Sequence, residues 1–552
     1  MQERYQSENP LRFALSTATL TSHLSVTASR FPDVPAFQFF GAALSYRAFE
    51  LQVERFAGWL QHRAGLKRGD RVALYLQNSP QWLIASYAVL RADMIIVPIS
   101  PMNRAGEVAH YLRDSGARLI VCAQDLADTA IAAVRGSDVT DIVVATYADY
   151  LPDDNDFTLS DWLTEPPRTF DGCVTWRSMM AADETPDAPA ATSDDVCALP
   201  FTSGSTGHPK ACMLTHGNLV HNAMGLSFWH GLRPGDSSLG AAPMYHVSGF
   251  NHAVTSPVFA GSTVVILPRW DRDLAAQLMA RYRVTHASLA PTAVIDLLAH
   301  PKLRDFDLSR LRRITSGGAA MPDEVWKRLR DRLGLPFIEA YGMTECAATT
   351  HLNLVEQPRP QCLGVPFFNT GSCIIDAVTG QELPVGETGE IAVRGPQVFK
   401  GYWNQPDATR EAFIEVAGQT FYRTGDIGYR DADGFFYMTD RAKRMINASG
   451  LKVWPAEIEN LLYQHEDVVE ACVIGVRDAY RGETVKAVVK LRDSARGSLT
   501  EAAFIEWSRQ KMAAYKYPRV VEFVDALPKS PAGKILWREL QDKENAKEIP
   551  IS

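Results

Sequence analysis

The chain is organised around Phe201-Thr-Ser-Gly-Ser-Thr-Gly-His-Pro-Lys-Ala-Cys-Met-Leu-Thr-His216. Serine and threonine hydroxyls surround two glycines here, and the loop closes on Lys210. Hydroxyls, bare backbone N–H groups and one ammonium can converge on an anion, as a polyphosphate requires. A solvated Gly/Ser linker is the alternative, but Pro209, Lys210 and the flanking apolar runs favour a phosphate-binding loop. The candidate phosphate ligands are Thr202, Ser203, Gly204, Ser205, Thr206, Gly207 and Lys210.

This loop is not a Walker A motif, because it lacks the Gly-Lys-Ser/Thr ending that would seat a magnesium-binding hydroxyl on a helix. A P-loop kinase is therefore disfavoured.

Length and composition narrow the class of protein. With 552 residues the chain exceeds one hydrophobic core, so several domains are expected. We find no apolar run long enough to cross a membrane and no signal peptide. A net charge of −8 argues against a nucleic-acid partner. The eight cysteines include no C-x-x-C pair, which favours neither disulfides nor a zinc site and indicates the cytoplasm.

Secondary-structure types alternate upstream of the loop. Apolar runs at 71–76, 94–98 and 118–122 predict strands, and the stretches 44–64, 80–90 and 105–114 predict helices. Strands and helices that alternate at this pitch form parallel, right-handed βαβ units. Residues 1–43 are expected to be irregular, and the Asp-, Thr- and Pro-rich segment 152–195 is expected to be surface loop.

Three stretches downstream of the loop carry candidate site residues. Pro243-Met-Tyr-His-Val-Ser-Gly249 contains His246, which taken alone is more often a packed or surface histidine. A strand at 313–316 runs into Gly317-Gly-Ala-Ala320, where glycines admit a flat ligand against the backbone. A strand at 336–341 ends in Gly342-Met-Thr-Glu345.

The carboxyl ends of strands are where doubly wound sheets bind their ligands. At that position Tyr341 could stack on a ligand, Thr344 could donate to a phosphate and Glu345 could bind Mg²⁺. Taken singly, each of the three is better explained by a structural role.

The predicted secondary-structure pattern changes from Gly386 onward, where helices give way to short strands. Short strands separated by turns, among them 389–394, 401–403, 422–427 and 435–438, predict a small antiparallel unit. Asp426 follows a glycine in a turn, where a carboxylate either bridges the two hydroxyls of a ribose or caps its own turn. Both explanations remain open.

A charged run, Asp440-Arg-Ala-Lys-Arg444, indicates a domain boundary. Beyond it, helices at 454–462 and 498–512 and strands at 468–476, 484–491 and 520–524 predict a compact α+β module. This module is expected to end in the flexible loop Pro528-Lys-Ser-Pro-Ala-Gly-Lys534, which presents Lys534.

In this order the motifs resemble those of the acyl-adenylate-forming ligases, the family of acyl-CoA synthetases, beetle luciferases and peptide-synthetase adenylation domains. The resemblance spans nearly the whole chain and rests on these stretches: Thr202 to Lys210, Tyr341 to Glu345, Tyr422-Arg-Thr-Gly-Asp426, Asp440 to Lys443 with Gly450, and Pro528 to Lys534. Such ligases activate a carboxylate with Mg-ATP to an acyl-AMP, rotate the small C-terminal domain and deliver the acyl group to a thiol.

The resemblance also implies roles for individual residues. Thr202 to Lys210 would hold the β- and γ-phosphates, and Gly317, Gly318, Ala319 and Tyr341 would line the adenine, with Glu339 and Gly342 in the same ATP site. Thr344 would contact the α-phosphate, Glu345 the Mg²⁺, and Asp426 with Arg441 the ribose. Lys534 would meet the carboxylate and the α-phosphate, Lys443 would be the hinge and Gly450 would line the CoA tunnel. His246, Val247, Ser248 and Gly249 would form part of the acyl pocket.

Two positions depart from the family pattern. Ala211 stands where glycine is usual after the loop lysine, and Asn447 stands where luciferases carry lysine, which argues against luciferase-like oxygenation. The stretch from Met445 to Glu459 is most similar to bacterial fatty acyl-CoA ligases.

The sequence thus predicts an α/β chain with a large N-terminal domain of doubly wound sheets (1–439), including a small antiparallel β unit (about 364–439), and a mobile α+β domain (440–552). The predicted activity is a fatty-acid:CoA ligase with ATP, Mg²⁺ and coenzyme A, preferring medium to long chains. An aryl-acid:CoA ligase and an enzyme that loads an acyl carrier protein are the alternatives. A cytoplasmic monomer or homodimer with at most peripheral membrane contact is expected.

Overall fold

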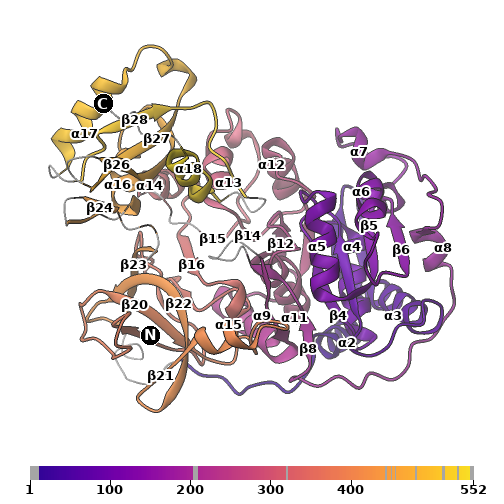
Figure 1. Ribbon diagram of the computed structural model, residues 1–552. Helices are drawn as coiled ribbons and strands as arrows, with labels where there is room; N and C mark the ends of the chain where they lie inside the picture. The colour runs from indigo at the N-terminus through magenta and orange to yellow at the C-terminus, as the bar shows by residue number, and fades with distance from the viewer. Residues whose placement is uncertain are drawn as a thin grey trace.

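The computed structural model of the protein describes residues 11–202, 209–318, 321, 323–441, 444, 446–448, 451–453, 455–478, 482–512, 516–530 and 534–546. It contains a large mixed α/β domain, an antiparallel β unit and a small C-terminal α+β domain (Figure 1). The predicted fold class is confirmed.

The first sheet contains seven described strands in the order β11-β8-β4-β3-β5-β6-β7. Apart from the antiparallel β11, its strands run parallel. Its central strands are continuous apolar runs, because a parallel sheet covered on both faces buries every side chain. The bounds are β3 Arg71–Tyr75, β4 Ile95–Pro98, β5 Ala117–Ala123, β6 Asp141–Ala145, β7 Val174–Thr175, β8 Val196–Ala198 and β11 Leu214–Thr215, with helices α3 Tyr46–His62, α4 Pro80–Arg91, α5 Ala105–Ser115 and α6 Ala127–Ala133.

The second sheet contains nine described strands in the order β18-β17-β16-β15-β14-β12-β13-β1-β2, parallel from β16 to β1. The bounds are β1 Pro35–Phe39, β2 Ala42–Ser45, β12 Ser237–Gly240, β13 Thr263–Ile266, β14 His286–Ser288, β15 Arg313–Gly317, β16 Phe337–Tyr341, β17 His351–Leu352 and β18 Val365–Pro366. Its helices include α9 His216–His230, α12 Arg272–Arg281, α13 Pro291–Leu298 and α14 Asp323–Leu333.

The two sheets share one hydrophobic core. Helix α4 is apolar on nearly all sides and is buried along its length up to Leu90, as expected of a helix between two layers. Asn78, just after β3, joins the carboxyl ends of both sheets. Its side-chain amide donates to the carbonyl oxygens of Gly240 (3.0 Å) and Leu267 (3.2 Å), and its oxygen accepts from the N–H of Met244 (2.8 Å).

The antiparallel unit predicted from Gly386 onward is present and begins earlier in the chain. It consists of β19 Gly371–Ile375, β20 Gly389–Arg394, β21 Phe413–Val416, β22 Gln419–Arg430 and β23 Phe436–Arg441. The strand expected at 401–403 is wrong, since only Tyr402 forms a bridge, to Cys212. Gly401 (φ +135°) turns the chain there, and a Cβ on it would lie 2.5 Å from a Thr409 methyl.

The C-terminal domain has its own core and sheet. Its elements are β24 Ile446–Ala448, β25 Leu451–Val453, α16 Pro455–Leu462, β26 Val468–Asp478, β27 Gly482–Leu491, α17 Glu501–Lys511, β28 Val520–Phe523 and α18 Trp537–Asn545. The expected end of the module at Lys534 is wrong, because α18 follows and packs on β26. Its mostly polar sequence gave little sign of a packed helix.

Two other expectations are wrong. Residues 1–43 are not irregular, since they include β1 and the helix α2 Leu20–Arg30, which Thr19 caps by accepting from the Ser22 N–H. The α2 sequence is rich in serine and threonine, which weakens its helical signal. Segment 152–195 is not only surface loop, because it contains α7 Asp161–Thr164, β7 and α8 Trp176–Met180, whose Trp176 and Met179 are buried.

Candidate active site

The sequence-predicted residues gather at the carboxyl ends of the second sheet's strands. Gly317 ends β15, Tyr341 ends β16, and Thr344 and Glu345 form a short 3-10 turn just after it. His246 follows β12 by a short loop. Open α/β sheets bind ligands along this edge. Ser203 to Gly207, Ala319, Lys443 and Gly450 lie outside the described residues.

Asp426 faces Tyr341 and not its own turn. The Tyr341 hydroxyl donates to Asp426 Oδ2 at 2.7 Å, and Asp426 is 2% exposed. Glu390 holds the turn instead, accepting from the Gly425 N–H at 3.0 Å and pairing with Arg423 at 2.6 Å. Asp426 also lies opposite Arg441 in the β22–β23 register. The Asp426 carboxylate therefore contacts Tyr341, a residue of the predicted adenine site, and its role at the ribose stays a prediction.

Tyr402 links the phosphate loop to Glu345. Its hydroxyl donates to Glu345 Oε1 at 2.9 Å, and the Lys210 ammonium lies 4.9 Å from the centre of its ring. Burial, followed by the nearby Glu345 carboxylate, raises the pKa of Tyr402 well above its ordinary value, so the hydroxyl keeps its proton. The ammonium of Lys210 and the carboxylate predicted to bind metal therefore both contact one aromatic side chain, the first at its ring and the second at its hydroxyl.

His246 is held as a neutral imidazole. Its Nδ1 lies 2.7 Å from Ser248 Oγ and accepts from the Ser248 N–H at 3.3 Å. Burial, and secondarily the charge of Lys534, lower the pKa of His246 to about 4. Helix α10 (Val247–Phe250) begins directly after it. Gly249 is required there, because a Cβ would lie 1.9 Å from the Pro243 carbonyl oxygen.

Lys534 comes to this site from the other domain. The Lys534 side chain is exposed, and its charge is near enough to His246 to contribute to the lowered pKa of that imidazole. Hydrogen bonds from the Ser530 N–H to the Lys534 carbonyl (2.7 Å) and from the Lys534 N–H to Ser530 Oγ (3.2 Å) close the base of its loop. Asn460 and Gln361 form a further contact between the domains, at 2.9 Å.

Glu339 is a buried carboxyl group on β16. Burial, the dominant cause, raises its pKa to about 8, although a hydrogen bond from the Met321 backbone favours the charged form. At neutral pH the group is therefore mostly a neutral acid and can donate a hydrogen bond. Close by, Gly342 packs against the Ala348 carbonyl so tightly that a Cβ would lie 1.4 Å from its oxygen.

The raised pKa of Glu339 predicts how stability depends on pH. The folded state holds the proton more tightly than the unfolded state, so the stability it gives is complete below about pH 4.5 and is lost as the pH rises toward 8. Glu339→Gln keeps the shape without the ionisation. We expect the variant to gain on the order of 3–5 kcal/mol over wild type between pH 5 and pH 8. Thermal unfolding of both proteins at the two pH values measures this, and an equal difference at both would contradict it.

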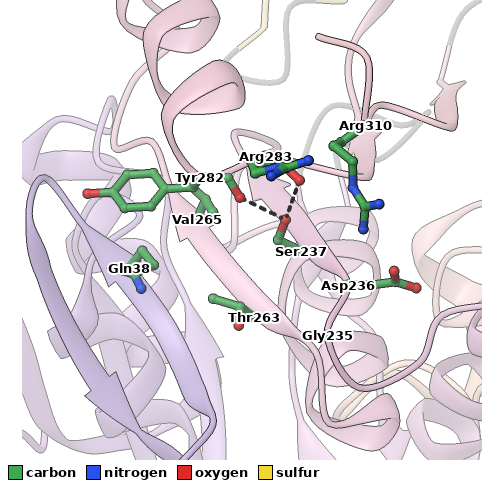
Figure 2. Close-up of a pocket in the computed structure, with 9 residues that line it drawn as sticks. All are labelled: Gln38, Gly235, Asp236, Ser237, Thr263, Val265, Tyr282, Arg283 and Arg310. Atoms are coloured by element: carbon green, nitrogen blue, oxygen red, sulfur yellow. Dashed lines mark hydrogen bonds between the residues drawn. The ribbon is translucent and has the colours of Figure 1, made fainter. Parts of the chain in front are cut away.

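A pocket of about 430 Å³ is lined by none of the predicted site residues described above (Figure 2). Its lining includes Gly235, Asp236 and Ser237 at the start of β12 and Thr263 at the start of β13. These are the amino ends of parallel strands, opposite the edge where such sheets bind ligands. The size of this pocket therefore does not make it the active site.

Two family models match this chain, one over most of the large domain and the other over most of the small domain that carries Lys534. Residues 24–403 match the model of the AMP-binding enzyme family, and residues 457–534 match that of the AMP-binding enzyme C-terminal domain. The chain belongs to the AMP-binding enzyme family. The family resemblance found in the sequence is confirmed.

Two relatives group this AMP-binding enzyme with the AMP-forming acyl-CoA ligases. A long-chain-fatty-acid–CoA ligase of Bacillus subtilis (strain 168) is 36% identical, over 98% of this chain and 97% of its own length. A feruloyl-CoA synthase of an Amycolatopsis species is 35% identical, over 92% of this chain and 96% of its own length. The enzyme class is confirmed, whereas the two names point to different acids.

Two solved structures of one relative, with and without ATP, can be compared with the domain arrangement seen here. ATP-bound MatB from Rhodopseudomonas palustris matches this AMP-binding enzyme with a TM-score of 0.83 and 28% identity, over 96% of this chain and 99% of that chain. The apo structure of MatB, with the same identity and coverage, gives 0.74. Because the two structures have one sequence, the difference reflects conformation. The present arrangement is more similar to the nucleotide-bound form.

Sequence reasoning missed Tyr402 and Asn78 in this AMP-binding enzyme. Tyr402 lay in a stretch expected to be an ordinary strand, and Asn78 is the second residue after the strand expected at 71–76. A polar residue just past an apolar strand was the available signal for Asn78, whereas nothing local marks Tyr402.

The described part of the AMP-binding enzyme contains no helix that is both long and apolar enough to span a bilayer. In the same residues, no three His, Cys, Asp or Glu side chains gather as a metal site. A magnesium ion that enters with a nucleotide needs only one or two carboxylates beside the phosphates, so Glu345 remains compatible with that role.

Proposed function

We propose that this AMP-binding enzyme is a fatty-acid:CoA ligase that prefers medium to long chains. The carboxylate attacks the α-phosphorus of ATP, the bond to pyrophosphate breaks and an acyl-AMP forms. The thiolate of coenzyme A then attacks the acyl carbonyl, and AMP leaves. The observation that supports the proposal most is that the charge of Lys534, from the C-terminal domain, acts on His246 of the large domain.

Apart from that of Tyr402, the proposed roles of individual residues are those that the family resemblance implies. Thr202 to Lys210 hold the β- and γ-phosphates, and Tyr402 keeps Glu345 and Lys210 apart so that Mg²⁺ and the phosphates can lie between them. Asp426, with Arg441, binds the ribose. Gly317, Gly318, Ala319, Glu339, Tyr341 and Gly342 surround the adenine. Attack on a polyanion needs cations and N–H donors over the developing charge, which Lys534 and Thr344 supply at the α-phosphate.

The second half-reaction requires another orientation of the C-terminal domain, for which we propose a boundary at 439/440, a hinge at Lys443 and a CoA tunnel lined at Gly450. We propose a cytoplasmic monomer or homodimer, consistent with eight free cysteines.

The acid panel that tests the substrate class measures kcat/KM for saturated acids of increasing length and for benzoates and cinnamates. Each methylene buried in an apolar tunnel contributes about 0.8 kcal/mol, so kcat/KM should rise about fourfold per carbon until the tunnel is full. A flat profile with faster turnover of aromatic acids would favour an aryl-acid:CoA ligase, the class to which the name of the Amycolatopsis relative points. Replacing CoA with a phosphopantetheinylated carrier protein tests the third alternative.

His246→Ala is expected to raise the KM for the acid while leaving the affinity for ATP close to wild type. We propose that His246 gates the acyl pocket, because it precedes α10 and faces Lys534. Since its pKa is about 4, the acid KM should show no titration near pH 6.5 in wild type. Ser248→Ala, which removes the hydroxyl partner of Nδ1 and keeps the backbone N–H, is the matched control for loss of position. Unchanged acid kinetics in His246→Ala would return this histidine to a structural role.

A further inference from the structure

A small polar cavity lies between the second sheet and the helices that cover it. Its volume of about 20 Å³ holds roughly one water molecule. The sheet side is lined by Ser238, Ser288 and Thr315, and the helix side by His230, His252 and Ser256. Nothing in the roles proposed above uses these side chains.

His230 supplies hydrogen-bonding groups that the protein itself does not use. It ends α9 and is 8% exposed. Among the described residues, neither of its ring nitrogens has a hydrogen-bond partner, and the same is true of the buried Ser238 and Ser256 hydroxyls. Most buried polar groups in proteins are satisfied, so three unsatisfied groups around one cavity indicate an absent polar partner.

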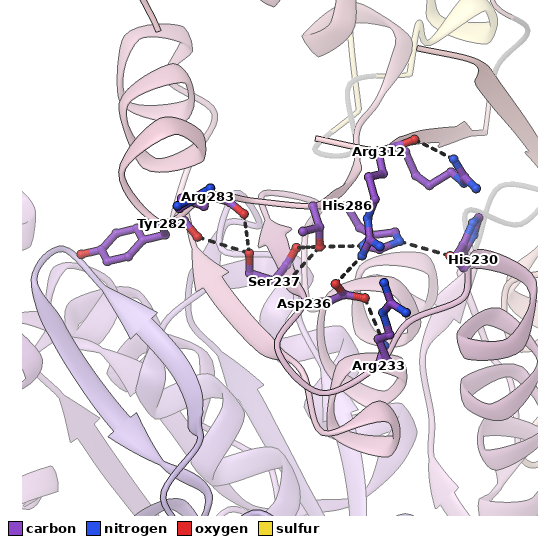
Figure 3. A network of polar contacts seen from close by, with 10 residues as sticks. His230, Arg233, Asp236, Ser237, Tyr282, Arg283, His286 and Arg312 are labelled. Atoms are coloured by element: carbon purple, nitrogen blue, oxygen red, sulfur yellow. Dashed lines mark hydrogen bonds and ion pairs between the residues drawn. The ribbon is translucent and has the colours of Figure 1, made fainter. Parts of the chain in front are cut away.

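His286 differs from His230, because each of its ring nitrogens has a hydrogen-bond partner within the protein. Its Nε2 lies 3.2 Å from the His230 carbonyl oxygen, and Nδ1 lies 2.8 Å from the Thr285 hydroxyl (Figure 3). A carbonyl only accepts, so Nε2 of His286 is the donor. The contact fixes the end of α9, while Arg312, the residue just before β15, pairs with Asp236.

The histidines around the cavity are neutral. Burial, then neighbouring His252, His286 and Arg313, lower the pKa of His230 well below its ordinary value, and burial lowers the pKa of His252 to about 4. A neutral imidazole offers one donor and one acceptor, and a serine hydroxyl offers both. The lining therefore suits an uncharged oxygen, whereas a carboxylate would require a protonated histidine that burial disfavours.

The cavity lies within reach of the proposed acyl site. Thr315 precedes Gly317 by two residues on β15, which is about 7 Å along a strand, and Ser288 is the last residue of β14. On the opposite wall, the π-helix η3 (Asn251–Thr255) carries His252 and continues the helix that begins after His246. A chain whose carboxylate lies between His246 and Lys534 would run down between β14, β15 and η3 to reach it.

We propose that the cavity binds the far end of the acyl group, and that the preferred acid carries a hydroxyl there, hydrogen-bonded to His230 and Ser256. This inference rests on the proposed acyl-CoA ligase function and refines its substrate class. A terminal hydroxyl takes the place of one water and satisfies groups that a terminal methyl would leave unsatisfied. A site built to bond a hydroxyl discriminates strongly against the analogue that lacks it.

The test compares acids of equal carbon number with and without a hydroxyl on the last carbon, by acid-dependent ATP–pyrophosphate exchange over a range of lengths. At the length that reaches the cavity, kcat/KM for the hydroxy acid should exceed that of the plain acid by at least about tenfold. His230→Phe should reduce this ratio to about one or less without changing the KM for ATP. His23→Phe alters a histidine outside the cavity whose Nδ1 also has no partner among the described residues, and should leave the ratio unchanged.

Ser256→Ala removes one oxygen and should lower the same ratio, which keeps the test decisive if His230→Phe does not fold. Faster turnover of the plain acid at every length, with robust exchange, would overturn the inference and leave the ligase function standing, with the cavity holding a resident water only. A high ratio unaffected by either cavity variant would also overturn it. Absence of exchange with every acid would instead contradict the proposed function itself.

Discussion

Lys534→Ala is expected to slow acyl-AMP formation by about a hundredfold or more, because the variant loses a charge-assisted contact to the developing charge at the α-phosphate. The structure places this lysine close enough to His246 to lower its pKa. Thioester formation from supplied acyl-AMP and CoA should remain near wild type, since that step uses the other domain orientation. The two half-reactions are therefore assayed separately.

Lys529→Ala is the matched control for this experiment. Lys529 lies in the same loop but pairs with Glu470 of its own domain. It should therefore keep acyl-AMP formation within a few-fold of wild type. Acyl-AMP formation that survives in Lys534→Ala would show that the assignment of Lys534 is wrong.

Lys443→Pro is expected to separate the half-reactions in the opposite sense. In the proposed mechanism Lys534 and the Gly450 loop both belong to the small domain, and the first acts before pyrophosphate leaves whereas the second acts when the thiol arrives. A domain rotation of this kind concentrates its φ and ψ changes in a few connector residues, and proline fixes φ near −65°. We expect acyl-AMP formation near wild type and thioester formation reduced on the order of 10²-fold, the cost of misplaced reacting groups.

Lys443→Ala removes the charge without restricting φ and should keep both half-reactions. If both fall together in Lys443→Pro, the cause is misfolding or damage to the ATP site. If both survive, the hinge lies elsewhere between Thr439 and Met445. The greater similarity of the present arrangement to ATP-bound than to apo MatB is why the adenylating orientation is the one we expect proline to retain.

Local sequence signals were strong enough to predict the parallel strands and their helices. Runs such as Arg71–Tyr75 are apolar throughout because both faces are covered, and Pro80 and Gly65 mark helix ends. Helices α2 and α18 escaped prediction, since each owes its stability to packing on an already formed surface and not to its own pattern. The same holds for α8, a five-residue helix in which only Trp176 and Met179 are buried.

In the candidate site, too, some residues could be predicted from the sequence and others could not. Motif residues such as Glu345 and Asp426 were recognisable by spacing, but their partners were not. The contact between Tyr402 and Glu345 joins positions 57 residues apart, and Tyr341 meets Asp426 across 85 residues. The histidine cavity was also hidden, because His230, His252 and Ser238 lie on three separate elements. Long-range pairings of this kind follow from topology, which no local pattern contains.

The measurement that tests the account most directly is carboxylate-dependent ATP–pyrophosphate exchange without CoA, followed by addition of CoA and analysis of the products. We predict exchange that requires both a fatty acid and Mg²⁺, and then stoichiometric AMP and acyl-CoA once CoA is present. Nucleotide binding without exchange, or formation of ADP and phosphate in place of AMP and pyrophosphate, would contradict it.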